Sequence, residues 1–206
     1  MTHDPTQAAS ELQRLIRDTA PPSAIAALLD GLPEASRIAA SRSLDRGLQR
    51  ALYKAVEGFL PLRLADMVPP GTPELTAVRH YGRNTLPVFT LFEKRFYSYP
   101  QDGSRAVGGA NFQSIQWLTG PGYFVVREDT ARGELLVDYN RVPTVAPAGF
   151  APIVENRANR SGLVYGAMID TLRRVSEHVT IGSAAKNGKD IGSYFTLCRE
   201  GRPAAP

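Results

Sequence analysis

The sequence predicts an α+β protein in which an N-terminal helical segment packs on an antiparallel, barrel-like β-sheet with one late helix. The first observation is an uneven distribution of aromatic residues: only Tyr53 and Phe59 precede Pro73. The part before Pro73 is rich in Ala and Leu, whereas the rest has the aromatic, Val and Thr content that is typical of strands. The second observation is a series of helix signals, and the third is a series of tight turns.

Three helices are expected before Pro61. Asp4-Pro5 has the pattern of an N-cap followed by proline at the first helical position, and Pro21-Pro22 ends that helix. A second, short helix ends at Gly31. Pro33 opens a longer third helix that ends at Gly58. Each helix has a single apolar stripe, so each must pack against another surface.

Turn signals divide the second part into strands. Gly120-Pro121-Gly122 fits a type II turn, and Arg132-Gly133 turns the chain back once more. Asn187-Gly188 is the strongest hairpin signal, flanked by strands over 178–185 and 191–199. The aromatic density of residues 86–99 favours a strand with a bulge. Residues 161–176 are predicted to form the late helix, because Val164, Met168, Leu172 and Val175 follow a helical stripe.

These elements define four segments: residues 1–60 as a helical cap or arm, 61–73 as a proline-rich join, 74–201 as a barrel-like domain, and 202–206 as a flexible tail. About six antiparallel strands suggest a sheet that curls or closes around a core. Such a barrel resembles the lipocalins and calycins in architecture alone, and no motif carries the resemblance further. A cystatin- or hotdog-like sheet wrapped around the late helix is the rival arrangement.

Charge and composition exclude several classes of partner. The net charge is +4, but the basic residues are scattered among acids and lack the clustered stripe that phosphate binding needs, so no nucleic acid is expected. No apolar run approaches the roughly 20 residues that span a bilayer. Cys198 is the only cysteine, and no secretory leader is visible at the N-terminus. We therefore expect a soluble, cytoplasmic protein.

No cofactor or metal is expected either. The glycines at 108–109 and 120–122 lack the spacing and the lysine of a phosphate-binding loop. His3, His80 and His178 are the only imidazoles, and nothing in their spacing fits a metal site.

His178 is the first candidate for acid–base chemistry. Pairing the strands outward from the Asn187-Gly188 turn places His178 opposite Leu197, on one face with Phe195. An imidazole among apolar side chains should have a lowered pKa, as a general base needs. The alternative is a histidine at the strand end that is hydrogen-bonded at the rim of the sheet.

Other candidate residues fall into two groups. Tyr81 and Tyr139 could donate to a developing oxyanion, and Asp138 is a candidate carboxylate unless its strand points it outward. A polar ligand group could be held by His80, Arg83 and Arg141, and an aromatic pocket wall could come from Trp117, Tyr123, Phe92 and Phe195. The alternative is that the aromatic residues are simply core and the arginines are solvated.

The first functional hypothesis is that the barrel interior binds a small, apolar or amphipathic molecule. The alternative is a cofactor-independent cyclase, isomerase or lyase that uses the same cavity, with His178 as acid or base. The second alternative is a protein-interaction module that acts through the helical arm, for example as a homodimer. The three hypotheses differ in whether the interior of the barrel contains a site.

Overall fold

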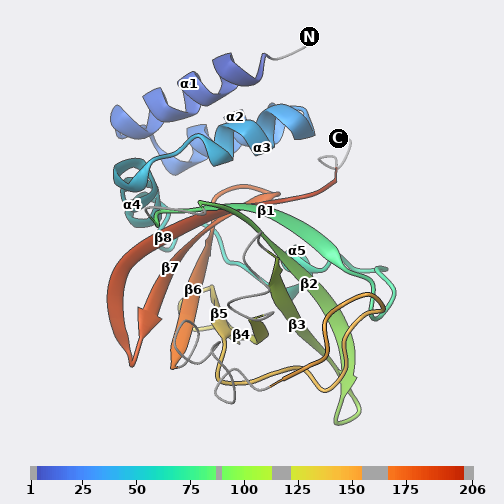
Figure 1. Cartoon of the computed structure of the whole chain (residues 1–206). Helices are drawn as coiled ribbons and strands as arrows, with labels where there is room; N and C mark the ends of the chain where they lie inside the picture. Colours follow the sequence, from blue (N-terminus) through green and yellow to red (C-terminus); the bar gives the residue numbers. More distant parts are fainter. Residues whose placement is uncertain (1–3, 87–89, 113–121, 155–166, 202–206) are drawn as a thin grey trace.

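The computed structural model describes residues 4–86, 90–112, 122–154 and 167–201 (Figure 1). Within these ranges the helices are α1 (Pro5–Arg17), α2 (Pro22–Gly31), α3 (Glu34–Arg42), α4 (Arg46–Ala55) and α5 (Leu64–Met67). The strands are β1 (Val78–Asn84), β2 (Leu91–Gln101), β3 (Ser104–Phe112), β4 (Tyr123–Asp129), β5 (Glu134–Asp138), β6 (Met168–Arg174), β7 (Val179–Lys186) and β8 (Lys189–Arg199).

The strands form one closed antiparallel barrel. Each strand pairs with the next along the chain, and β1 closes the barrel by pairing with β8, with Gly82 opposite Leu197. This up-and-down order confirms the predicted α+β, barrel-like fold. No helix among the described residues combines the length and the hydrophobicity that a membrane span requires.

Helices α1 to α4 lie on one side of the barrel (Figure 1). Helices α3 and α4 contact β8, and α1 packs on α3 and α2. Val179, Ile181 and Cys198 face outward from the barrel into the same apolar cluster as the helices. The predicted long third helix is wrong, because it is divided into α3 and α4. Asp45 is the reason: its side chain accepts a hydrogen bond from Leu48 N and begins a new helix.

The predicted late helix is also wrong over residues 168–174, which form β6; residues 161–166 lie outside the described part. Met168 and Leu172 pack in the barrel interior, whereas Arg173 reaches outward to Glu134. Apolar residues four apart satisfy both a helical stripe and the two-residue period of a strand. Pairing with β5 and β7 selects the strand.

Three glycines in the sheet make room for three phenylalanine rings inside the barrel. Gly82 lies opposite Phe92, Gly109 opposite Phe124, and Gly182 opposite Phe195. In each pair a Cβ on the glycine would overlap the phenylalanine ring. The rings of Phe92, Phe124 and Phe195 therefore lie over glycine backbone on the neighbouring strand, as in aromatic rescue of glycine in designed sheets.

The Asn187-Gly188 hairpin is confirmed. Both residues have positive φ, 52° and 73°, and Lys186 pairs with Lys189. The pairing then shifts, because Ala185 lies opposite Asp190 but Ala184 lies opposite Ser193. Beyond this bulge each residue of β7 faces a residue two positions later in β8 than an unbroken hairpin would give. The inward and outward faces are kept because a two-residue shift preserves them.

The two ends of the barrel differ. Helix α5 covers one end, where Met67 and Val68 join the interior apolar cluster. We call this the α5 end. At the opposite end β1 stops at Asn84 and β2 begins at Leu91, and the connections from β3 to β4 and from β5 to β6 also start there.

Candidate functional site

A polar cluster lies inside the barrel among apolar side chains. Its members are Lys94 on β2, Asn111 on β3, Tyr139 directly after β5, and Asp170 on β6. Alternation along β2 turns Lys94 to the same face as its neighbours Phe92 and Phe96, which pack in the interior. Four separate segments of the chain thus contribute one polar side chain each.

Hydrogen bonds join the members of this Lys94 cluster. Lys94 Nζ donates to Asn111 Oδ1 at 3.0 Å and lies 3.3 Å from Asp170 Oδ2. It also makes a close contact with Tyr139 Oη. Tyr139 Oη accepts from Asn111 Nδ2 at 3.1 Å and donates to Asp170 Oδ2 at 3.3 Å. The lysine amine is therefore held at one point, with oxygen atoms on three sides.

Aromatic rings surround the amine beyond these partners. The ring centroids of Tyr139, Phe124 and Phe195 lie 4.9, 5.0 and 5.1 Å from Lys94 Nζ, and that of Phe92 lies at 5.8 Å. Lys94 itself is 2% exposed. Rings at these distances attract a cation through their faces, and they also exclude the water that would otherwise solvate it.

Burial shifts the pKa values of the two ionisable groups of the cluster in opposite directions. It lowers the pKa of the Lys94 amine, although the Asp170 charge opposes this shift. Burial raises the pKa of the Asp170 carboxyl, against the opposing effect of Lys94. Both shifts favour uncharged forms, because a charge in a dry interior loses its hydration. Among the described residues Asp170 Oδ1 has no hydrogen-bond partner, although the residue is 3% exposed.

The structure brings three of the sequence-predicted site residues to this cluster: Tyr139, Phe92 and Phe195. His80 also points inward but lies nearer the α5 end, where its Nε2 is 3.0 Å from Met67 O and its ring packs against Phe96. Burial lowers the pKa of His80 to about 3. It is therefore a neutral imidazole that donates to a backbone carbonyl.

His178 lies elsewhere. It follows β6 in the turn before β7, its backbone carbonyl accepts a hydrogen bond from Arg199 N, and its side chain is buried. The prediction that His178 lies beside Phe195 is wrong. The bulge in the hairpin shifts the register and places Phe195 opposite Gly182. Burial, with the charges of Arg199 and Arg37, lowers the pKa of His178. It belongs to the α5 end, away from the Lys94 cluster.

Two more candidates point outward along β1. Tyr81 accepts a hydrogen bond from Arg79 and lies under the guanidinium of Arg42. Arg83 donates to Arg42 O at 2.7 Å and so joins the barrel to α3. Both side chains hold the helices on the barrel wall.

The remaining candidates lie on the outer face of the barrel, where Tyr123 and Asp138 are buried, or beyond the described residues. Asp138 faces outward and pairs with Arg127 and Arg141, the latter largely exposed. Tyr123 donates from the outer face to Ala151 O. Trp117 lies outside the described residues.

Lys94, Asn111 and Asp170 were not predicted from the sequence, although two of them had a usable signal. In Phe92-Glu-Lys94-Arg-Phe96 a two-residue period places the lysine on the phenylalanine face. Asp170 has the same position between Met168 and Leu172. Because this segment was predicted as a helix, the two-residue period that turns Asp170 inward was not applied to it. Within the described ranges no group of three His, Cys, Asp or Glu side chains could hold a metal ion.

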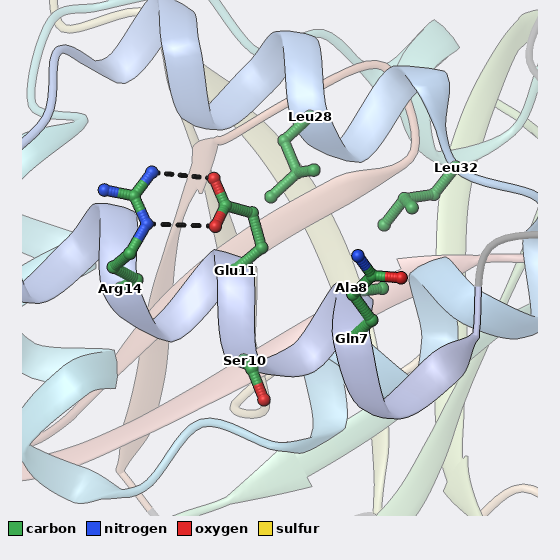
Figure 2. A pocket seen from close by; sticks show the side chains of 7 residues that line it. All are labelled: Gln7, Ala8, Ser10, Glu11, Arg14, Leu28 and Leu32. Atoms are coloured by element: carbon green, nitrogen blue, oxygen red, sulfur yellow. Dashed lines mark hydrogen bonds and ion pairs between the residues drawn. The ribbon is translucent and has the colours of Figure 1, made fainter.

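The helical arm has a surface pocket of 340 Å³ between α1 and α2 (Figure 2). Leu28 of α2 and Leu32 directly after it line one side, and Ala8 lines the pocket from α1. At its edge Arg14 forms an ion pair with Glu11 at 2.7 Å, as Figure 2 shows. The pocket brings together no buried ionisable groups.

Comparison with known proteins adds no relative: no family model matches the chain, and no curated protein or solved structure shows a significant match.

Proposed function

We propose that the barrel binds a small, largely apolar molecule whose oxygen-bearing head group meets the Lys94 cluster. One observation carries the proposal: among the described residues Asp170 Oδ1 has no hydrogen-bond partner, although the side chain is buried. A buried polar atom without a partner costs free energy, so native proteins seldom leave one. A ligand hydroxyl would complete this hydrogen bond by donating to Oδ1, and a ligand carbonyl would complete it by accepting from the protonated carboxyl.

Exposed apolar side chains at the end opposite α5 support an apolar ligand. Leu86, Leu91 and Ile191 are 50%, 51% and 47% exposed; Leu86 follows β1, Leu91 begins β2, and Ile191 lies near the start of β8. These strands are neighbours in the barrel, so the three residues lie along one part of this end, which we call the apolar rim. Such a rim would favour the approach of an apolar molecule.

The head group follows from the donors and acceptors of the cluster. Lys94 and Tyr139 offer N–H and O–H groups, which suit a carbonyl or hydroxyl oxygen. An uncharged head group suits the site, because burial disfavours charge there. Phe92 and Phe195 lie between the cluster and the apolar rim and would contact the hydrocarbon part.

Displacement of an apolar fluorescent probe, N-phenylnaphthylamine, by decanol would test this proposal. Decanol should displace the probe from the wild type and from Lys54→Met, which changes an exposed lysine on α4. Lys94→Met should weaken the binding of decanol about tenfold. The loss of one head-group interaction costs roughly 1.4 kcal/mol, which corresponds to a factor of about ten in affinity. Equal decanol affinities in the two variants, or no probe binding to the wild type, would contradict the proposal.

A second candidate is cofactor-independent acid–base catalysis on the same ligand. The observation that favours it is the buried contact of 3.3 Å between Lys94 Nζ and Asp170 Oδ2, where burial shifts the pKa values of the two groups in opposite directions, as is found where an acid and a base work together. Under this hypothesis Lys94 is the base and Asp170 is the acid, in place of His178. Asp170→Asn should then abolish turnover even at saturating ligand, whereas His178→Gln should preserve turnover.

A further inference from the structure

The chain uses lysine sparingly, and it places one lysine inside the barrel. Lys54, Lys94, Lys186 and Lys189 are the only lysines. Lys94 alone is buried; the other three are exposed or half-buried. Because the chain has so few lysines, the choice of lysine rather than arginine at this interior position indicates that a property specific to lysine is used there.

At other buried positions, where a positive charge has hydrogen-bond or ion-pair partners, this protein uses arginine. Arg37 is 0% exposed and donates to the backbone carbonyls of Leu32 and Gly201. Arg173 is 7% exposed and pairs with Glu134. A guanidinium stays protonated in proteins, whereas burial lowers the pKa of a lysine amine, whose uncharged form is a nucleophile.

We propose that Lys94 forms an imine with an aldehyde ligand of the barrel, with Asp170 as the proton donor. This inference rests on the proposed binding of an apolar molecule and names its head group as an aldehyde. The geometry behind it is an amine fixed among Asn111, Tyr139 and Asp170, inside a ring of aromatic side chains.

The reaction balances without any other reagent. The lone pair of Lys94 Nζ attacks the aldehyde carbon, and the carbonyl oxygen takes one proton from the nitrogen. The nitrogen lone pair then forms the C=N bond while the C–O bond breaks, and the oxygen leaves as water after taking a second proton from Asp170. The products are a protonated imine, the Asp170 carboxylate and water.

Each neighbour of Lys94 has a defined part in these steps. Burial favours the uncharged amine and the protonated carboxyl at the start. Tyr139 Oη, in contact with Nζ, can donate to the tetrahedral oxygen. Afterwards the cationic imine nitrogen would keep the four ring faces and the Asp170 carboxylate around it, which stabilises the product.

Trapping with cyanoborohydride would test the imine in the intact protein. Decanal should add a mass equal to that of decanal less one oxygen atom, and peptide mapping should place it on Lys94 rather than on Lys54, Lys186 or Lys189. Lys94→Met should lose this adduct. At decanal concentrations that saturate each protein, as probe displacement reports, Asp170→Asn should slow trapping by tenfold or more, because the amine remains but its proton donor is lost.

Decanol separates the imine from simple binding, because it cannot form one. Adducts spread evenly over all four lysines, or none on Lys94 while decanol displaces the probe, would overturn the imine and leave the binding proposal intact. If neither decanal nor decanol displaces the probe, both proposals fail.

Discussion

At the scale of single residues, buried ionisable groups mark the interior of this protein. His80 and Lys94 lie opposite each other on β1 and β2, and both point into the barrel. Their environments differ. His80 donates to one carbonyl beside Phe96, whereas Lys94 meets three polar side chains. Burial favours the neutral form of each group, so the stability of the barrel depends on pH through these residues.

His80→Gln should make folding less sensitive to acid. The pKa of His80 is lowered from its ordinary value to about 3, so the native state binds fewer protons than the unfolded chain. The stability from neutral His80 is complete above about pH 6.5 and is lost as pH falls from there, by at most about 1.4 kcal/mol per pH unit. Urea unfolding at about pH 7 and about pH 5 measures this loss. An equal loss of unfolding free energy between the two pH values in wild type and variant would contradict the role assigned to His80.

At the scale of elements, glycines decide how neighbouring strands fit. Gly182 gives space to the ring of Phe195, whereas Gly188 supplies the positive φ of the hairpin turn. The first is a packing requirement and the second is a backbone requirement. They can be separated by experiment, because Gly31 at the end of α2 has neither a close neighbour nor a positive φ.

Gly182→Ala should destabilise the barrel by about 1–3 kcal/mol, the usual cost of overpacking a core. The added methyl overlaps the ring of Phe195, which must move. Adding Phe195→Leu should recover part of the loss, because a smaller side chain leaves room for the methyl. Chemical denaturation of the single and double variants gives the coupling free energy between Gly182 and Phe195. Strictly additive effects would show that the two residues do not share this space.

Gly188→Ala should cost about 1 kcal/mol more than Gly31→Ala. A Cβ at either position meets no atom within 4 Å, so the two substitutions differ mainly in backbone strain. Gly188 has φ +73°, which disfavours any side chain. Thermal melts of the two variants decide the matter, and equal melting temperatures would rule out a strained turn.

At the scale of the whole molecule, the helices and the barrel depend on each other. Val175, Val179, Ile181 and Cys198 on the barrel pack in one cluster with apolar side chains of α1 to α4. Arg173 binds Tyr53 O at 2.8 Å, and Arg83 binds Arg42 O. The helices therefore cover a strip of barrel wall that would be apolar and exposed without them.

A fragment of residues 74–206 should keep β-structure but become poorly soluble. Removing the helices exposes the apolar strip that includes Val179, Ile181 and Cys198, and exposed patches of this kind cause association. Circular dichroism would follow the strands, and light scattering would follow association. A monomeric fragment with the melting temperature of the full chain would show that the helices contribute nothing to the barrel.

Local signals in the sequence determined the helical first part, the β-rich second part and the hairpin at Asn187-Gly188. They act over a few residues: a proline and a cap at the start of α1, two residues of positive φ in the turn. They failed where two periods coincide, as in β6, or where a cap lies within a continuous stripe, as at Asp45. They also left the bulge after Asp190 unpredicted.

Only the tertiary structure decided that the barrel closes and that Lys94, Asn111, Tyr139 and Asp170 meet inside it. Lys94 and Asp170 are 76 positions apart and lie on β2 and β6, which are not neighbours in the sheet. Alternation along a strand gives the face of each side chain, but not its partner across the interior. Closure through β1 and β8 brings these distant faces together, and burial then shifts the pKa of both groups.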